Sequence, residues 1–113
     1  MIHRIRDRQS FDRLAREGTR IRRSALWCTW CPDPESNAVA VAFTFSRAFG
    51  TAVQRNRMRR RIRAMLHEID ATAPLPPGLL SIGGSSALIE LTFDQLRTRV
   101  ISLTDELRAA SRA

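Results

Sequence analysis

Six arginines and one asparagine lie within nine positions, 55–63, and this segment holds the side chains with the clearest chemical potential. It reads RNRMRRRIR. A guanidinium group keeps its charge, offers a planar fork of donors that matches phosphate oxygens, and stacks on bases. The cluster therefore predicts binding to a polyanion such as RNA. The alternative is a solvated basic face that has no partner.

The apolar residues around these arginines predict a helix over about 52–69. At 100° per residue they form one stripe on the helix surface. The stripe consists of Met58, Ile62, Met65, Leu66 and Ile69. Arginines four residues apart repel by roughly 0.2–0.5 kcal/mol per pair, and the pairs 55/59, 57/61 and 59/63 have few acidic neighbours. A bound anion is the simplest explanation for such a face.

Charge is unevenly distributed along the 113 residues. The net charge is +8, and all 19 basic residues are arginine. Residues 1–63 hold 15 arginines and 5 acidic residues, a net charge of +10. Residues 64–113 hold 4 arginines and 6 acidic residues, a net charge of −2. We therefore expect the contact surface in the first half and scaffold in the second.

Residue sets for protein-based catalysis are not evident. We find no carboxylate pair, no Ser/His/Asp set and no Gly-rich phosphate loop, so no catalytic residue and no metal ligand is predicted. Cys28 and Cys31 have metal-ligand spacing, but on a strand they would face opposite sides, and a structural zinc site needs four ligands. Without an apolar run that could span a bilayer or a signal-peptide pattern, we expect a cytoplasmic protein with reduced thiols.

The first 23 residues are predicted to contain one short helix. We expect an extended basic arm at 1–9. Ser10 can cap a helix over 11–17, and Gly18 is a typical helix stop. Residues 19–23 are expected to be a basic connector.

Two strands are predicted next, over 25–31 and 38–46. The first is rich in strand formers, and in the second large side chains alternate with small ones. This alternation places Phe43 and Phe45 in the core. The Pro- and Asp-containing turn at 32–37 suggests that the two strands form an antiparallel hairpin.

After the arginine helix we expect a loop at 70–78, a strand at 79–82 and a helix that ends near residue 110. Thr92 and Gln95 fit a capping box. The apolar stripe of this last helix would consist of Phe93, Leu96, Val100, Leu103 and Leu107. No repeat or second domain is visible, so residues 1–113 are expected to form a single RNA-binding domain.

The run from Phe45 to Arg63, FSRAFGTAVQRNRMRRRIR, resembles the signature of the bacterial ribonuclease P protein component. That family has a strand that ends in Ser and a basic residue, a turn with Gly, then Ala-Val and an Arg-Asn-Arg core with further basic residues. A basic N-terminus and Ser10-Phe11 at the start of a helix also fit. The resemblance covers residues 4–69 well and residues 79–110 only in element order.

This resemblance implies a fold and a function. The fold would be α+β, a small single-domain α/β sandwich in the order α-β-β-β-α-β-α. Its helices would pack on one mixed sheet with a left-handed βαβ crossover. The catalytic RNA of ribonuclease P, with bound Mg²⁺, would cleave precursor tRNA endonucleolytically. The protein would bind that RNA, hold the 5′ leader in a cleft and strengthen metal and substrate affinity. No protein partner is evident.

Residue roles follow from the same resemblance. The basic motif would face the catalytic RNA and the substrate; its matching residues are Arg55, Asn56, Arg57, Arg59, Arg60 and Arg63. Arg61 belongs to the same basic segment. Arg47 matches the basic residue after the strand, and Phe11 matches an aromatic on the first helix that lines the leader cleft.

The chain departs from the family pattern at several positions. Ala48 stands where a second basic residue often occurs, Ala15 where a second cleft aromatic occurs, and Gly83 and Gly84 where a basic residue follows the last strand. Trp27 or Trp30 could replace the missing ring. The two lie on opposite faces of their strand, so at most one is expected to reach the cleft.

Two other functions remain as alternatives. The chain could be a non-catalytic RNA-binding module of a ribosomal or RNA-chaperone type. A basic peripheral membrane protein is less favoured, because an interfacial helix needs a broader apolar face than 52–69 offers.

Overall fold

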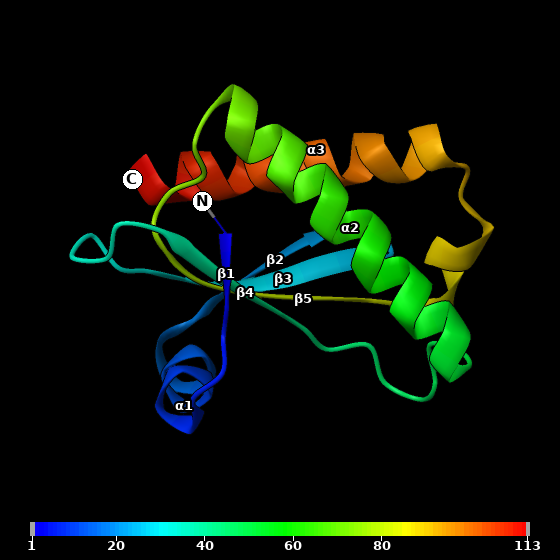
Figure 1. The fold of residues 1–113 in the computed structure, drawn as a ribbon, viewed down its shortest axis with the longest axis horizontal. Coiled ribbons are helices and arrows are strands. Elements are labelled where there is room, and N and C mark those ends of the chain that lie inside the picture. Colours follow the sequence, from blue (N-terminus) through cyan, green and yellow to red (C-terminus); the bar gives the residue numbers. More distant parts are fainter. Residues whose placement is uncertain (1, 113) are drawn as a thin grey trace.

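A computed structural model describes residues 2–112 and arranges five strands in one mixed sheet with helices on both faces (Figure 1). The elements are β1 (Ile2–Arg4), α1 (Arg8–Glu17), β2 (Thr19–Arg23), β3 (Leu26–Pro32), β4 (Val39–Phe43), α2 (Ala52–Thr72), β5 (Gly78–Gly84), the 3-10 helix η1 (Ser86–Glu90) and α3 (Phe93–Arg112). The α+β class and the expected element order are confirmed, with β1 added before them and η1 before α3.

The strand order across the sheet is β1-β4-β5-β3-β2. β1, β4 and β5 are parallel neighbours, whereas β5, β3 and β2 pair in antiparallel fashion. The expected hairpin between the strands over 25–31 and 38–46 is wrong, because β5 lies between β3 and β4. A turn signal between two strands shows that the chain reverses but not that a later strand inserts between them. α2 is the crossover from β4 to β5, and its expected left-handed sense stays a prediction.

Two segments that were expected to lack regular structure are strands. In place of an extended arm at 1–9, β1 pairs with β4 through Ile2↔Val39 and Arg4↔Val41, and α1 begins at Arg8. In place of a connector at 19–23, β2 pairs with β3 and buries Ile21 between two exposed arginines. That alternation is a strand signal which the high charge of the segment concealed.

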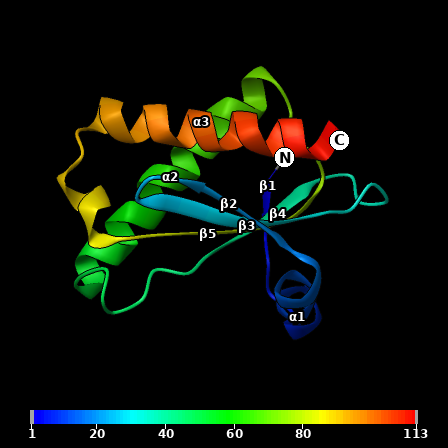
Figure 2. The same ribbon diagram turned by 180° about the vertical axis from the view of Figure 1, so that it is seen from behind.

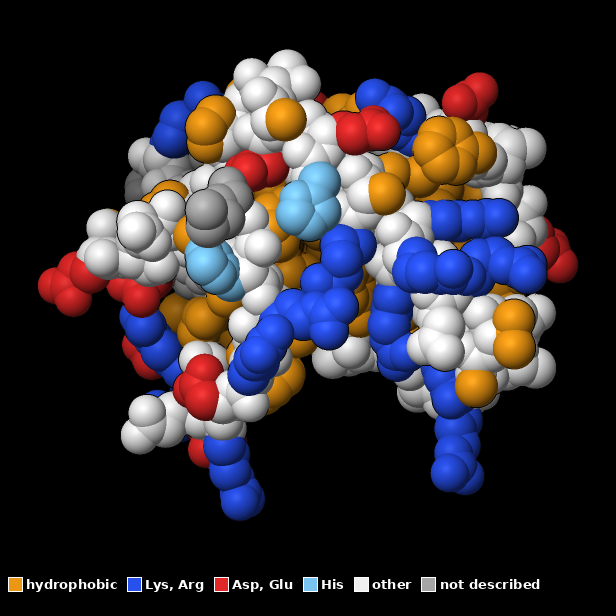
Figure 3. Space-filling view, in the orientation of Figure 1, with side chains coloured by type: hydrophobic (Ala, Val, Ile, Leu, Met, Phe, Trp, Pro, Cys, Tyr) orange, Lys and Arg blue, Asp and Glu red, His pale blue; other side chains and the backbone are white. Residues whose placement is uncertain are grey.

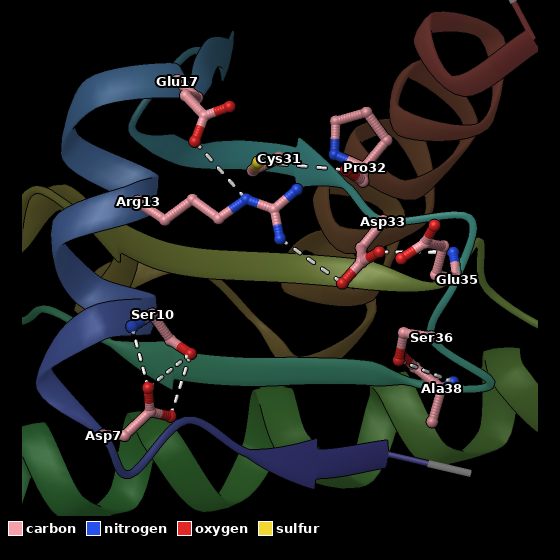
Figure 4. Close-up of polar contacts among 10 residues, drawn as sticks. All are labelled: Asp7, Ser10, Arg13, Glu17, Cys31, Pro32, Asp33, Glu35, Ser36 and Ala38. Atoms are coloured by element: carbon pink, nitrogen blue, oxygen red, sulfur yellow. Dashed lines mark hydrogen bonds and ion pairs between the residues drawn. The ribbon is translucent and has the colours of Figure 1, made fainter.

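Each of the three α-helices has a side-chain cap at its N-terminus. Asp7, not Ser10, caps α1, and its carboxylate accepts the Ser10 N–H at 2.9 Å (Figure 4). Gly18 ends this helix as expected. Thr51 and Gln54 form a capping box at α2, with bonds of 2.8 and 3.2 Å. The capping box predicted at α3 is confirmed.

Helices pack on both faces of the sheet. α2 and α3 cover one face, while α1 lies against the other, at one end (Figures 1 and 2). The main core contains the predicted stripes of α2 and α3, except that Ile69 is only partly buried and Phe93 is 54% exposed. A smaller cluster beneath α1 consists of Ile5, Leu14 and Cys31.

The strand over 38–46 ends earlier than expected, at Phe43. Phe45 nonetheless enters the core, where its ring packs on Phe49 with centroids 4.7 Å apart. This pair fixes the start of the segment that leads from β4 to α2. Within residues 2–112, no helix is both long enough and apolar enough to cross a membrane.

The capping box of α2 should contribute measurably to stability. We expect Thr51→Ala to lower the free energy of unfolding by about 1 kcal/mol, because the Gln54 N–H loses the Thr51 hydroxyl that accepts its hydrogen bond. The melting temperature should fall by about 4 °C. Thr72→Ala is the matched control, since that hydroxyl only bonds back to Glu68 O within the last turn. Equal melting temperatures for the two variants would contradict the assignment.

Candidate nucleic-acid interface

The arginines at 55–63 lie on α2 as the sequence predicts. Every residue from 55 to 63 is helical, and the buried stripe anchors the helix to the sheet. The exposed members of the segment are Asn56, Arg57, Arg60 and Arg61. The half-buried members are Arg55, Arg59 and Arg63. We call these six arginines and Asn56 the arginine face.

Neutral groups position the three half-buried arginines. Arg55 Nη1 donates to Gly50 O at 3.1 Å, and Arg59 Nη1 donates to Asn56 Oδ1 at 2.7 Å. The Arg63 guanidinium lies over the Phe43 ring, 5.1 Å from its centroid. Burial, with the charge of nearby Arg4, lowers the pKa of Arg63 from its usual value. These contacts hold the side chains in place without neutralising their charge.

No carboxylate within residues 2–112 forms an ion pair with the arginine face. Other arginines do form ion pairs among the described residues: Arg13 with Glu17 and Asp33, Arg23 with Glu106, Arg97 with Glu68, and Arg108 with Asp105. Figure 3 shows arginine side chains gathered over the part of the molecule that α2 crosses in Figure 1. The positive charge of this face is therefore left for a ligand.

A groove beside α2 brings in an arginine that the sequence reasoning missed. It measures about 560 Å³ and is lined by Arg4, Val53, Asn56, Arg59, Arg60 and Arg63. Arg4 reaches it because β1 pairs with β4, which places Ile2 and Arg4 on the face that α2 covers. A three-residue strand is too short to show a period, so the sequence carried no usable signal for this contact.

The opposite face of the sheet is only partly covered by α1. Phe11, 42% exposed, lies in a groove of about 190 Å³ with Leu14, Ala15, Thr29 and Ser81. The small side chain at Ala15 leaves this groove with the single ring of Phe11. Arg13 links α1 to the end of β3 through a contact of 3.4 Å to Asp33, and a second contact of 3.4 Å to Glu17 within α1 orients its guanidinium group (Figure 4).

Trp27 lies on this open face, and Trp30 is buried in the main core. Arg20 and Arg22 of β2 place their guanidinium carbons 5.3 and 5.1 Å from the centroid of the Trp27 ring system. Gly83 makes room for the indole, because a Cβ there would lie 2.7 Å from Trp27 Nε1. The prediction that the two tryptophans face opposite sides is confirmed, and Trp27 is the one that can supply a second ring.

Arg47 is exposed in the segment between β4 and α2, beyond the end of the strand. Ser46 and Ala48 beside it are exposed as well, while Phe45 and Phe49 anchor the segment. Arg47 lines neither groove. The structure therefore does not bring Arg47 together with the rest of the predicted binding residues.

The two cysteines are separated by the sheet, as predicted. Cys28 belongs to the main core and Cys31 to the cluster under α1, and both are free thiols. Burial raises the pKa of Cys28 to about 12. A thiol of this kind stays protonated at neutral pH, so Cys28 behaves as a core residue.

The amino-acid sequence is similar to one family of known proteins. Residues 2–108 match the family model Ribonuclease P. The ribonuclease P protein component of Micrococcus luteus is 31% identical over 96% of this chain and 93% of its own length. That of Synechococcus elongatus is 34% identical over 71% of this chain and 70% of its own length.

Solved structures share the fold. The RNase P protein of Staphylococcus aureus superposes with a TM-score of 0.81 at 17% identity, covering 92% of this chain and 94% of the other. The RNase P protein of Thermotoga maritima gives 0.79 at 18% identity, covering 92% and 96%. Together with the family match over nearly the whole length, this establishes that the chain belongs to the ribonuclease P protein family, the protein components of a ribonucleoprotein endoribonuclease of tRNA processing.

Proposed function

We propose that this protein component uses the two faces of its sheet for two RNAs. As a member of the family it associates with ribonuclease P RNA. In our proposal the arginine face of α2 binds that catalytic RNA near the cleavage site. The open face around Phe11 and Trp27 holds the 5′ leader of precursor tRNA.

The observation that carries this proposal is the lack of a carboxylate partner for the arginine face within residues 2–112. A helix that keeps six positive charges in three turns gains most from a partner with regularly spaced phosphates. Each phosphate neutralised releases condensed counterions, which favours binding at low salt. Phosphate contacts of this kind position an RNA without reading its sequence.

The open face supports the leader part of the proposal. Leader nucleotides are single-stranded, and proteins bind such strands by stacking bases on aromatic rings beside positive charge. Phe11 and Trp27 are the rings, Arg20 and Arg22 supply the charge, and Thr29 and Ser81 form a floor of small residues between them. A leader base that stacks on the indole would displace a guanidinium group from the ring, and that arginine would then contact a leader phosphate.

We further propose that Mg²⁺ is held mainly by the catalytic RNA. A guanidinium group has no acceptor atom and cannot coordinate a metal ion. What the arginine face contributes is positive charge, which lowers the repulsion between catalytic RNA and substrate and so reduces the Mg²⁺ concentration that assembly requires. Cytoplasmic location stays part of this proposal.

Reconstitution tests the proposal directly. The protein is mixed with a bacterial ribonuclease P RNA at a Mg²⁺ concentration too low for the RNA alone, and 5′ cleavage of precursor tRNA is followed. We expect cleavage to be rescued. Binding of the RNA without rescue would instead favour a non-catalytic module of a ribosomal or RNA-chaperone type.

Exposed and internally bonded arginines of α2 should respond differently to substitution. Arg57→Ala and Arg60→Ala should each weaken binding to the catalytic RNA and reduce the slope of log affinity against log salt by roughly 0.7–0.9. Their melting temperatures should not fall below the wild-type value, because Arg57 and Arg60 make no stabilising contact within residues 2–112 and Arg57→Ala also removes the repulsion of the 57/61 pair. Arg55→Ala should also lower the melting temperature, because it loses the bond to Gly50 O.

Arg112→Ala, near the end of α3, is the control and should leave affinity and salt slope unchanged. Should Arg57→Ala and Arg60→Ala leave both quantities at wild-type values too, the arginine face is not the contact surface.

Replacement of Trp27 should affect only the leader. We expect Trp27→Leu to weaken binding of precursor tRNA to the reconstituted enzyme by about 1–3 kcal/mol, the usual contribution of one stacked base. Trp27→Phe should retain most of the affinity. Binding of mature tRNA, which has no leader, should be unchanged. An equal loss for precursor and mature tRNA would contradict the proposal that Trp27 contacts the leader.

A further inference from the structure

An exposed phenylalanine lies beside the arginine face, outside the motif that defines the family. Phe93 is the first residue of α3 and is 54% exposed. It shares a groove of about 400 Å³ with Arg57, Arg60, Arg61 and Ala64 of α2. Helical periodicity predicts Phe93 in the buried stripe of α3, but the stripe begins one turn later, at Leu96. The ring is therefore not needed to complete the core.

The ring of Phe93 is open to a ligand. Guanidinium groups lie over the rings of Trp27 and Phe43, but within residues 2–112 none lies over Phe93. Arg57, Arg60 and Arg61 line the groove and have no carboxylate partner among the described residues. An uncovered aromatic ring among unpaired arginines combines the two features that bind one unpaired nucleotide, since the base stacks and the phosphates pair.

The surroundings of the groove agree with an anionic ligand. Asp94 follows Phe93 in the chain and Glu90 precedes it, but neither lines the groove, whereas three arginines do. The capping box of Thr92 and Gln95 holds the first turn of α3, and with it the backbone of Phe93, in a fixed position.

The groove is continuous with the arginine face. Arg60 lines this groove and also the groove that contains Arg4. Phe11 and Trp27, by contrast, lie on the other face of the sheet. A molecule that covers the arginine face together with the neighbouring Arg4 would therefore reach Phe93, whereas a leader bound between Phe11 and Trp27 would not.

We infer that Phe93 is a base-stacking residue for an unpaired nucleotide of the catalytic RNA, which extends the RNA-binding surface from α2 onto the start of α3. This inference rests on the proposed function, because it takes the arginine face as the site of that RNA. The stacked base lies on the ring, and its flanking phosphates pair with Arg57, Arg60 and Arg61.

Variants of Phe93 test the inference in the full-length protein. Phe93→Ala and Phe93→Leu should weaken binding to the catalytic RNA alone, without substrate, by roughly 5- to 100-fold. Phe93→Trp should stay within about threefold of wild type, because it keeps a ring. Chemical probing of the RNA should show at least one unpaired base that wild type protects and Phe93→Leu exposes. Ile101→Ala, an exposed apolar residue elsewhere on α3, is the control and should bind as wild type does.

The outcomes separate this inference from the proposed function. If wild type binds the RNA and rescues cleavage while Phe93→Leu binds equally well, the inference is wrong and the proposed function stands. If Phe93→Leu binds the RNA normally but the assembled enzyme loses affinity for precursor tRNA, the occupant is the substrate and the inference is again wrong. Failure of wild type to bind the RNA would overturn both.

Discussion

Repulsion between like charges on one helix is the constraint around which the molecule is organised. The arginine face has three i,i+4 pairs, each of which costs roughly 0.2–0.5 kcal/mol. Burial of one Met, Leu or Ile side chain contributes roughly 1.5–3 kcal/mol, and α2 buries four such residues. Packing therefore outweighs the repulsion, and α2 stays helical with its charge uncompensated. The helix therefore does not depend on bound RNA to stay folded with the arginine face exposed.

The sheet separates this surface from a second one. β5 is the central strand and serves both: Leu80 and Ile82 point into the main core, whereas Ser81 and Gly83 face the open side. Small residues on the open side leave space for Phe11 and Trp27, which lie on different elements. Because β5 pairs with β3 and β4 along its length, the two surfaces are held by one rigid strand. A protein of 113 residues can thus hold the arginine face and the open face at a fixed separation.

The sequence predicts those features of the arrangement that depend on residues close together in the chain, and it misses those that depend on distant residues. The apolar stripe of α2 and the capping box of Thr92 are local patterns, and the structure confirms both. Neither β1 nor the place of β5 between β3 and β4 is local, because each depends on pairing with distant strands. Phe93 fits the helical period of α3, but it lies beyond the end of the core. At such a position the period of the sequence does not predict whether a side chain is buried. Family resemblance supplied the element order, yet it could not supply Arg4, Arg20, Arg22 or Phe93 as candidate contacts.

The salt dependence of binding between the wild-type protein and the ribonuclease P RNA tests the central claim most directly. If the arginine face is neutralised by phosphates, the five arginines that make no backbone hydrogen bond should give a slope of log affinity against log salt of about −3.5 or steeper. A shallow slope, near zero, with affinity retained at high salt would contradict the account. It would mean that the charge on α2 is not what holds the RNA.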